Sequence, residues 1–270
     1  MNLPIPGFLV ELLAPDRWPT FAFVSARVGG LMIAAPLWSL SALPRVARAA
    51  IALLITILLL PLAPTAAMPE QAIELPLPLA MEFLLGLAVG LTAAMLVQGA
   101  SLAGEVISIQ MGLSLGPVLS PMAEPQPAGV GQIQSTLALL IFVLTNGHLV
   151  LLRGLAASLQ ALPPGHPFAF TDGAAGILAL FGRLFALALS AAAPVMVTLI
   201  LVNLAMALLH RAVPQINTMM VAFPLSIGIG LVMVGAALPL IAATIGGWMQ
   251  GLDSNVQAVL DAFRPLGGGS

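Results

Sequence analysis

Residues 79–116, LAMEFLLGLAVGLTAAMLVQGASLAGEVISIQMGLSLG, decide the fold. The stretch contains no Pro, its only charged residues are Glu82 and Glu105, and apolar side chains recur throughout it. A continuous helix of this length would measure about 57 Å, whereas the hydrocarbon core of a bilayer is about 30 Å thick. We therefore predict a membrane protein in which this helix either leaves the lipid or breaks.

The composition is also typical of a chain that lies in a membrane. Of the 270 residues, 60% are hydrophobic and 7% are charged, against about 25% charged residues in soluble domains. The eight basic residues are all Arg and the formal net charge is -2, so no basic face is predicted to bind nucleic acid. The absence of Cys excludes disulfides and thiolate metal sites, and the absence of Lys excludes a P-loop. We expect no cofactor and no metal.

Apolar runs long enough to cross a bilayer recur along the chain. A span needs roughly 20 residues at about 1.5 Å of rise per residue. Residues 174–209 form a second overlong run, about 54 Å as a helix, in which Pro194 predicts a kink. We predict an all-α polytopic membrane protein with one domain over residues 1–264 and a flexible tail over residues 265–270. Its six helical spans are expected at about residues 18–38, 49–62, 79–98, 132–152, 174–209 and 219–248.

The positions of the arginines predict an orientation, because short cytoplasmic loops collect positive charge. Arg45 and Arg48 lie between the first and second spans, and Arg211 lies between the fifth and sixth. With six spans these loops share one side of the membrane, so both termini are expected outside. Arg17 and Arg153 favour the reverse orientation.

Charged and amide side chains interrupt the apolar helices. A charge near the bilayer centre costs about 3 kcal/mol or more unless it is paired or faces water. Pairing between helices is the favoured interpretation, and an aqueous path for substrate or protons is the alternative. Amides at such positions are expected to bond across helices. The charged residues are Arg27, Glu82, Glu105 and Arg183, and the amides are Gln98, Gln110, Gln132, Gln134 and Asn203.

Glycines at helical spacing predict a packing face. Gly86 and Gly90 stand one helical turn apart, as small residues do where membrane helices approach closely. Gly112 and Gly116 repeat the spacing at the end of the same helix. The first pair is therefore assigned to helix packing.

A membrane protein of this composition could also be a hydrolase or a solute transporter. Ser114 in GLSLG matches the nucleophile-elbow pattern, but that elbow needs a strand before it and a helix after it. Here a long helix precedes and a Pro-rich loop follows, and His148, the only His within a span, is interpreted as a helix-interface residue. A transporter often shows inverted repeats, and none is evident. We expect no enzymatic activity, and we expect Ser114→Ala to be nearly silent.

Residues 116–131, GPVLSPMAEPQPAGVG, are predicted to form an apolar loop. Four prolines remove backbone donors and exclude regular helix. Met122 lies inside this loop, and a flexible Met side chain can form a deformable seal.

Three segments resemble one known family in order and approximate spacing. They are GEVISIQMGLS at residues 104–114, NGHLVLLRGL at 146–155 and LVNLAMALLHRAVPQINTMMVAFPLSI at 201–227. Together with the N-terminal runs, the chain resembles the FliR family over roughly residues 20–250. The resemblance implies a non-enzymatic, channel-forming subunit of the flagellar type III protein export gate in the bacterial inner membrane, at the flagellar basal body. The homologous T subunit of virulence type III secretion injectisomes is the alternative.

The resemblance also implies partners and site residues. Assembly with FliP and FliQ is expected, with FlhB and FlhA nearby and unfolded flagellar proteins as substrates. The family's helices form hairpins stacked in a spiral around a channel, and the loop after the GEVISIQMGLS segment acts as its plug. The plug residues would be Gln110, Met111, Leu115, Pro117, Val118, Leu119, Pro121 and Met122. The cytoplasmic turn of the last hairpin would contain His210, Arg211, Pro214, Gln215 and Asn217.

Overall fold

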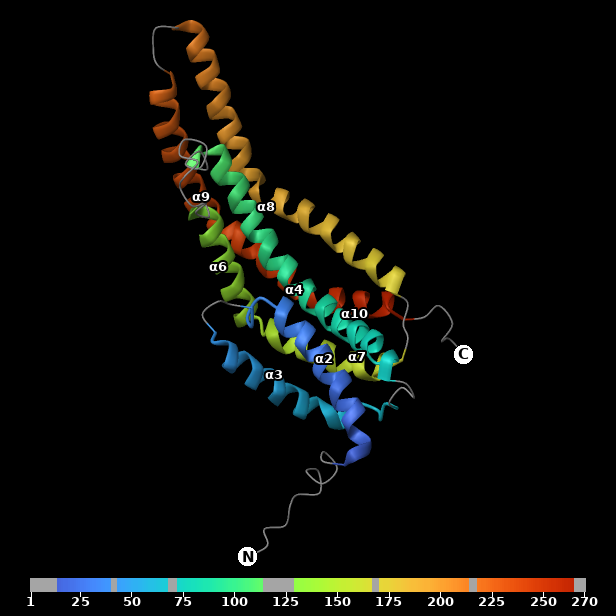
Figure 1. Cartoon of the computed structure of the whole chain (residues 1–270). Coiled ribbons are helices and arrows are strands. Elements are labelled where there is room, and N and C mark those ends of the chain that lie inside the picture. The colour runs from blue at the N-terminus through green and yellow to red at the C-terminus, as the bar shows by residue number, and fades with distance from the viewer. Residues whose placement is uncertain are drawn as a thin grey trace, which may run out of the picture. The chain divides into compact units, whose positions relative to one another are not determined.

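A computed structural model describes residues 14–39, 43–67, 72–113, 129–166, 170–213 and 218–264. The regular elements among these residues are all helices, without any strand, which confirms the all-α prediction (Figure 1). The α-helices are α2 (Trp18–Ala34), α3 (Arg45–Leu59), α4 (Pro76–Gln110), α6 (Gly129–Leu144), α7 (Gly147–Ala161), α8 (Phe170–Ala212), α9 (Thr218–Gln250) and α10 (Leu252–Ala262). Short 3-10 turns occur at η1 (Pro15–Arg17), η2 (Leu60–Leu62) and η3 (Ala72–Glu74).

The helices form two compact units. The first unit comprises Met1–Ala94, Asn146–Leu180 and Gly251–Ser270, and the second comprises Met95–Thr145 and Phe181–Gln250. Helices α4 and α8 each contribute one part to each unit. The single domain expected over residues 1–264 stays a prediction, and the tail at residues 265–270 lies outside the described residues.

Several described helices are long and apolar enough to cross a membrane. They are Arg45–Leu62, Pro76–Gln110, Ala174–Ala212 and Met220–Ala262, and α6 with α7 could make a fifth as one broken span. The six expected runs are all helical, but the first is shorter than expected. Helix α2 has 17 residues and ends at Ala34, because Pro36 disfavours helical backbone in the residue before it.

The fourth expected span, residues 132–152, is interrupted. Helix α6 ends at Leu144 and α7 begins at Gly147. Between them Asn146 adopts the left-handed conformation with φ 57°, which Asn tolerates better than most residues. The Asn-Gly pair at 146–147 was a turn signal inside an otherwise apolar run.

The two overlong helices are confirmed. Helix α4 has 35 residues and α8 has 43. Helix α4 ends at Gln110 rather than near Gly116, because Gly112 has φ 80° and a left-handed Gly ends a helix. Pro194 lies inside α8, and Figure 1 shows α8 bent along its length, as expected where a Pro removes a backbone donor.

Candidate functional site

A buried Arg is the most unusual feature of the first unit. Arg27 shares the buried face of α2 with Phe23, Val24 and Leu31, at the three- and four-residue spacing of one helix face. Arg27 is 0% exposed. A guanidinium cannot be deprotonated in a protein, so its charge must be balanced inside the unit.

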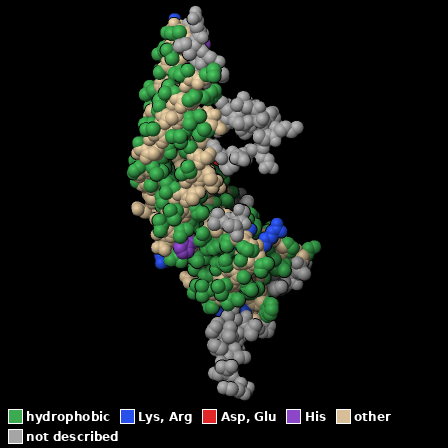
Figure 2. Space-filling model, turned by 90° about the vertical axis from the view of Figure 1, so that its left-hand side faces the viewer, with side chains coloured by type: hydrophobic (Ala, Val, Ile, Leu, Met, Phe, Trp, Pro, Cys, Tyr) green, Lys and Arg blue, Asp and Glu red, His purple; other side chains and the backbone are tan. Residues whose placement is uncertain are grey.

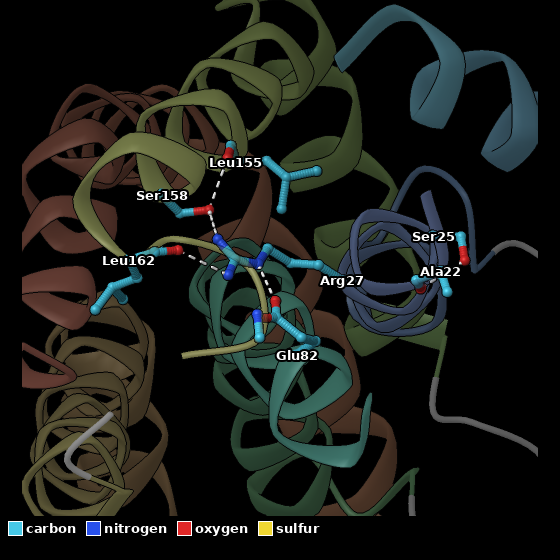
Figure 3. Close-up of polar contacts among 8 residues, drawn as sticks. Ala22, Ser25, Arg27, Glu82, Leu155, Ser158 and Leu162 are labelled. Carbon is cyan, nitrogen blue, oxygen red and sulfur yellow. Dashed lines mark hydrogen bonds and ion pairs between the residues drawn. The ribbon is translucent and has the colours of Figure 1, made fainter. Parts of the chain in front are cut away.

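Three groups from other parts of the chain surround the Arg27 guanidinium (Figure 3). Its Nε donates to Oε2 of Glu82 in α4 at 2.6 Å. Its Nη1 donates to Oγ of Ser158 in α7 at 3.0 Å, and its Nη2 donates to the carbonyl oxygen of Leu162 at 2.9 Å. The cation therefore joins α2, α4 and the C-terminal end of α7.

The acceptors around Arg27 are themselves held in place. Glu82 is 1% exposed, and its Oε1 accepts a hydrogen bond from the backbone N–H of Gly165 at 2.9 Å. Gly165 has φ 81°, a conformation that favours Gly. The Ser158 hydroxyl accepts from Arg27 and donates to the carbonyl of Leu155 at 2.6 Å. We call this set, Arg27, Glu82, Ser158, the Leu162 carbonyl and the Gly165 N–H, the Arg27–Glu82 node.

The Arg27–Glu82 node is a paired, hydrogen-bonded ion pair. Removing two charges from water costs several kcal/mol for each ion, and only good geometry with further hydrogen bonds repays that cost. Both conditions are met here, since each charged group has a partner on two or more sides. With exposed fractions of 0% and 1%, neither side chain reaches solvent within the first unit. The arrangement supports pairing, rather than an aqueous path, for these two residues.

Backbone contact between α2 and α4 brings the two charges together. A Cβ on Gly86 would overlap the carbonyl of Arg27, and a Cβ on Gly30 would overlap the carbonyl of Phe83. A Cβ on Gly90 would lie 2.8 Å from the Cβ of Ala34. Only Gly permits this approach. Gly86 lies one turn after Glu82, so the close crossing places that carboxylate beside Arg27.

Ser158→Ala is expected to lower the free energy of unfolding by about 1–3 kcal/mol, because Nη1 of Arg27 loses its buried acceptor. Chemical unfolding of the purified protein in detergent measures the change. Ser135→Ala is the matched control, since the Ser135 hydroxyl is exposed and bonds only within its own helix, to the carbonyl of Gln132. Equal stability of the two variants would contradict a role for Ser158 in the node.

The second unit also uses glycines where its helices meet. A Cβ on Gly104 in α4 would lie 2.6 Å from Cα of Gly131 in α6. Met111 is fully buried just after α4. It fills the space beside Gly230 in α9, and a Cβ on Gly230 would lie 2.5 Å from the Cγ of Met111. Met111 therefore anchors the start of the predicted plug loop to α9, and Gln110 is half-buried beside it. The other predicted plug residues, Leu115, Pro117, Val118, Leu119, Pro121 and Met122, lie outside the described residues.

Among the described residues, Arg27–Glu82 is the only ion pair between the predicted polar residues. Glu105, Arg183 and Asn203 are exposed on the second unit, and no described residue forms an ion pair or hydrogen bond with their side chains. Gln134 is buried in α6 without a partner for either amide atom among the described residues. His210 and Arg211 occupy the exposed last turn of α8. Of the predicted hairpin turn, Pro214, Gln215 and Asn217 lie outside the described residues.

Four groups that build the site were not predicted from the sequence, namely Ser158, the Leu162 carbonyl, Gly165 and Gly30. Ser158 and Gly165 carried no signal, because a Ser in a helix and a Gly in a turn are common. Gly30 did carry one, since Gly29–Gly30 interrupts an apolar helix three residues after Arg27. Among the described residues no cluster of His, Asp and Glu could hold a metal ion.

The comparisons with known proteins agree with one another. Residues 18–252 match the family described as bacterial export proteins, family 1. The chain is 30% identical to the flagellar biosynthetic protein FliR of Escherichia coli (strain K12), over 83% of this chain and 84% of the relative. It is also 30% identical to FliR of Bacillus subtilis (strain 168), over 85% of this chain and 90% of the relative. A third FliR, from Pectobacterium carotovorum, is 30% identical over 86% of this chain and 87% of the relative.

Proposed function

This chain belongs to the bacterial export proteins, family 1, the family of the flagellar biosynthetic proteins FliR, and from that premise we propose that it is a channel-forming subunit of the flagellar type III export gate. In this proposal it passes unfolded flagellar proteins across the inner membrane at the flagellar basal body. It assembles with FliP and FliQ, beside FlhB and FlhA. The T subunit of a virulence injectisome is the alternative, and the flagellar relatives favour the first assignment.

The exposed apolar surface of the second unit supports the proposal that this chain assembles with other subunits. Helix α8 exposes large side chains such as Phe185, Leu201 and Leu208, and only 28% of the apolar window in Ala174–Ala212 is buried. On the face drawn in Figure 2, which is the left-hand side of Figure 1, hydrophobic side chains are also widespread, interspersed with other atoms. Contiguous exposed apolar surface of this kind marks contact with lipid or with other proteins.

The length of α8 favours contact with protein over contact with lipid for part of this surface. The 39 residues of Ala174–Ala212 extend about 58 Å along a helix, whereas bilayer hydrocarbon covers about 30 Å. Roughly half of the apolar face therefore has no lipid to cover it, so protein neighbours are needed there. This requirement fits a gate subunit in a hetero-oligomer and disfavours a solute transporter that works alone.

The loop between α4 and α6 is the proposed plug. Its sequence has four prolines among apolar residues, and a hydrophobic constriction can block ions by excluding water. Met111 packs against Gly230, and Gly104 packs against Gly131, so both ends of the loop start from closely packed helices. We propose that unfolded substrate displaces the loop while these anchors stay in place.

Deletion of residues 121–127 is expected to raise ion leak across the inner membrane, because the apolar seal is lost. Ion leak is measured in cells together with secretion of flagellar proteins and with recovery of the complex with FliP and FliQ. Replacement of the same residues by Gly and Ser is the control for loop length, and it should also leak. Leak at the wild-type level with an intact complex would show that the loop has a packing role instead.

A further inference from the structure

Arg183 lies inside an apolar helix and has no partner among the residues that the structure describes. It lies on the second unit within Ala174–Ala212, a segment apolar enough to cross a membrane. Its side chain is exposed, and no described residue forms an ion pair or hydrogen bond with it. This is the opposite of Arg27, whose guanidinium has three acceptors.

The position of Arg183 makes an unpaired charge unfavourable. It lies about 20 Å from the first residue of α8 and about 44 Å from the last, at about 1.5 Å of rise per residue. Charges within apolar membrane helices pair with one another, with backbone carbonyls, or face a water-filled cavity. Since the second unit supplies no partner among its described residues, an acidic residue of a partner subunit would satisfy this charge.

The surface next to Arg183 is shaped for a second helix. Gly182, Ala186 and Ser190 are exposed and follow each other at intervals of one helical turn. Nothing lies within 4 Å of the place where a Cβ on Gly182 would be. The Ser190 hydroxyl is satisfied by the carbonyl of Leu187 at 2.8 Å, so it can be covered by an apolar neighbour without losing a hydrogen bond. Small residues in this pattern let two membrane helices approach closely.

We propose that this face of α8, formed by Gly182, Arg183, Ala186 and Ser190, docks a membrane helix of a partner subunit that carries an Asp or Glu opposite Arg183. The inference rests on the proposed function, because it takes the partner to be another subunit of the export gate. A carboxylate fits the planar guanidinium in bidentate geometry. A lipid phosphate could also neutralise Arg183, but it would make no use of the small-residue face beside it.

Arg183→Glu is expected to lower the amount of partner subunit recovered with this chain at least about tenfold, because like charges would face each other in a buried interface. Arg183→Lys keeps the charge and should retain most of the complex. Arg264→Glu is the matched control. It reverses an exposed Arg outside the apolar helices, whose pairing with Asp261 is on the surface, so recovery should stay at the wild-type level. Equal recovery for Arg183→Glu and Arg264→Glu would overturn the proposal.

A second experiment does not depend on the charge-reversed variant folding. The chain contains no Cys, so Ala186→Cys introduces its sole thiol, and a photoreactive reagent attached there can be activated in native membranes. The expected product is an adduct with a partner helix in which an Asp or Glu interrupts an apolar run. Changing that acidic residue to Arg should then restore recovery of the Arg183→Glu complex.

The outcomes separate this inference from the proposed function. Adducts with lipid alone, or with a partner helix that has no acidic residue, would overturn the docking proposal even if secretion is normal. A protein adduct and a charge-dependent complex, found in cells whose flagellar secretion does not need this chain, would support the docking face and contradict the export function.

Discussion

Glu82→Ala is expected to lower the free energy of unfolding by about 3–5 kcal/mol, which is a large part of the stability of most proteins. The variant leaves the Arg27 charge buried without its ion-pair partner, and the N–H of Gly165 loses its acceptor. Chemical unfolding of the purified protein in detergent measures the loss. Glu74→Ala, at an exposed carboxylate, is the control and should change stability little.

The double variant Arg27→Met/Glu82→Leu separates the charge from the packing. Replacing both members of a buried ion pair by apolar residues of similar size is often neutral or stabilising. We therefore expect the double variant to recover at least half of the stability lost by Glu82→Ala. If Glu82→Ala is within about 0.5 kcal/mol of wild type, the node is not a main source of stability in the first unit.

Gly86→Ala is expected to prevent normal packing of α2 on α4, with a loss of about 3 kcal/mol or more. The added Cβ would overlap the backbone carbonyl of Arg27, and no change of rotamer can relieve a clash with backbone. The helices must then separate, which also pulls Glu82 away from Arg27. The amount of monodisperse protein in detergent and its unfolding temperature measure the effect.

Gly29→Ala provides the matched control for this substitution. Gly29 lies in α2 beside Gly30, and nothing lies within 4 Å of the place where its Cβ would be. Since Ala favours a helix over Gly by up to about 1 kcal/mol, Gly29→Ala should be neutral or slightly stabilising. Comparable stability of Gly86→Ala and Gly29→Ala would show that the close crossing of α2 and α4 does not exist in the folded protein.

The helices could be predicted because their signals are local. The Pro-free run at residues 79–116 and the apolar run at 174–209 gave the two overlong helices, since length and composition alone decide whether a helix can exceed a bilayer. The ends were less certain. Whether Gly112 or Gly116 ends α4 depends on which of the two adopts positive φ. The sequence alone does not determine which Gly does so.

The Arg27–Glu82 node could be predicted only in part. The sequence identified Arg27 and Glu82 as charges that need partners, but Glu105 was an equally acceptable partner on the same helix. Tertiary packing at Gly30 and Gly86 determines that Arg27 pairs with Glu82, because it fixes which turn of α4 faces α2. The exposure of Arg183 could not be predicted either. The sequence pattern of an apolar helix that contains an Arg is the same whether that Arg is buried or faces another protein.

Secretion of flagellar proteins is the measurement that tests the central claim most directly. In the bacterium that makes this chain, its gene is removed and flagellar proteins are measured in the culture medium, with and without the wild-type chain supplied again. We expect secretion to be lost on removal and restored by the wild-type chain. Flagellar secretion that continues without the chain would contradict the assignment, and loss of injectisome secretion in its place would move the chain to the virulence branch.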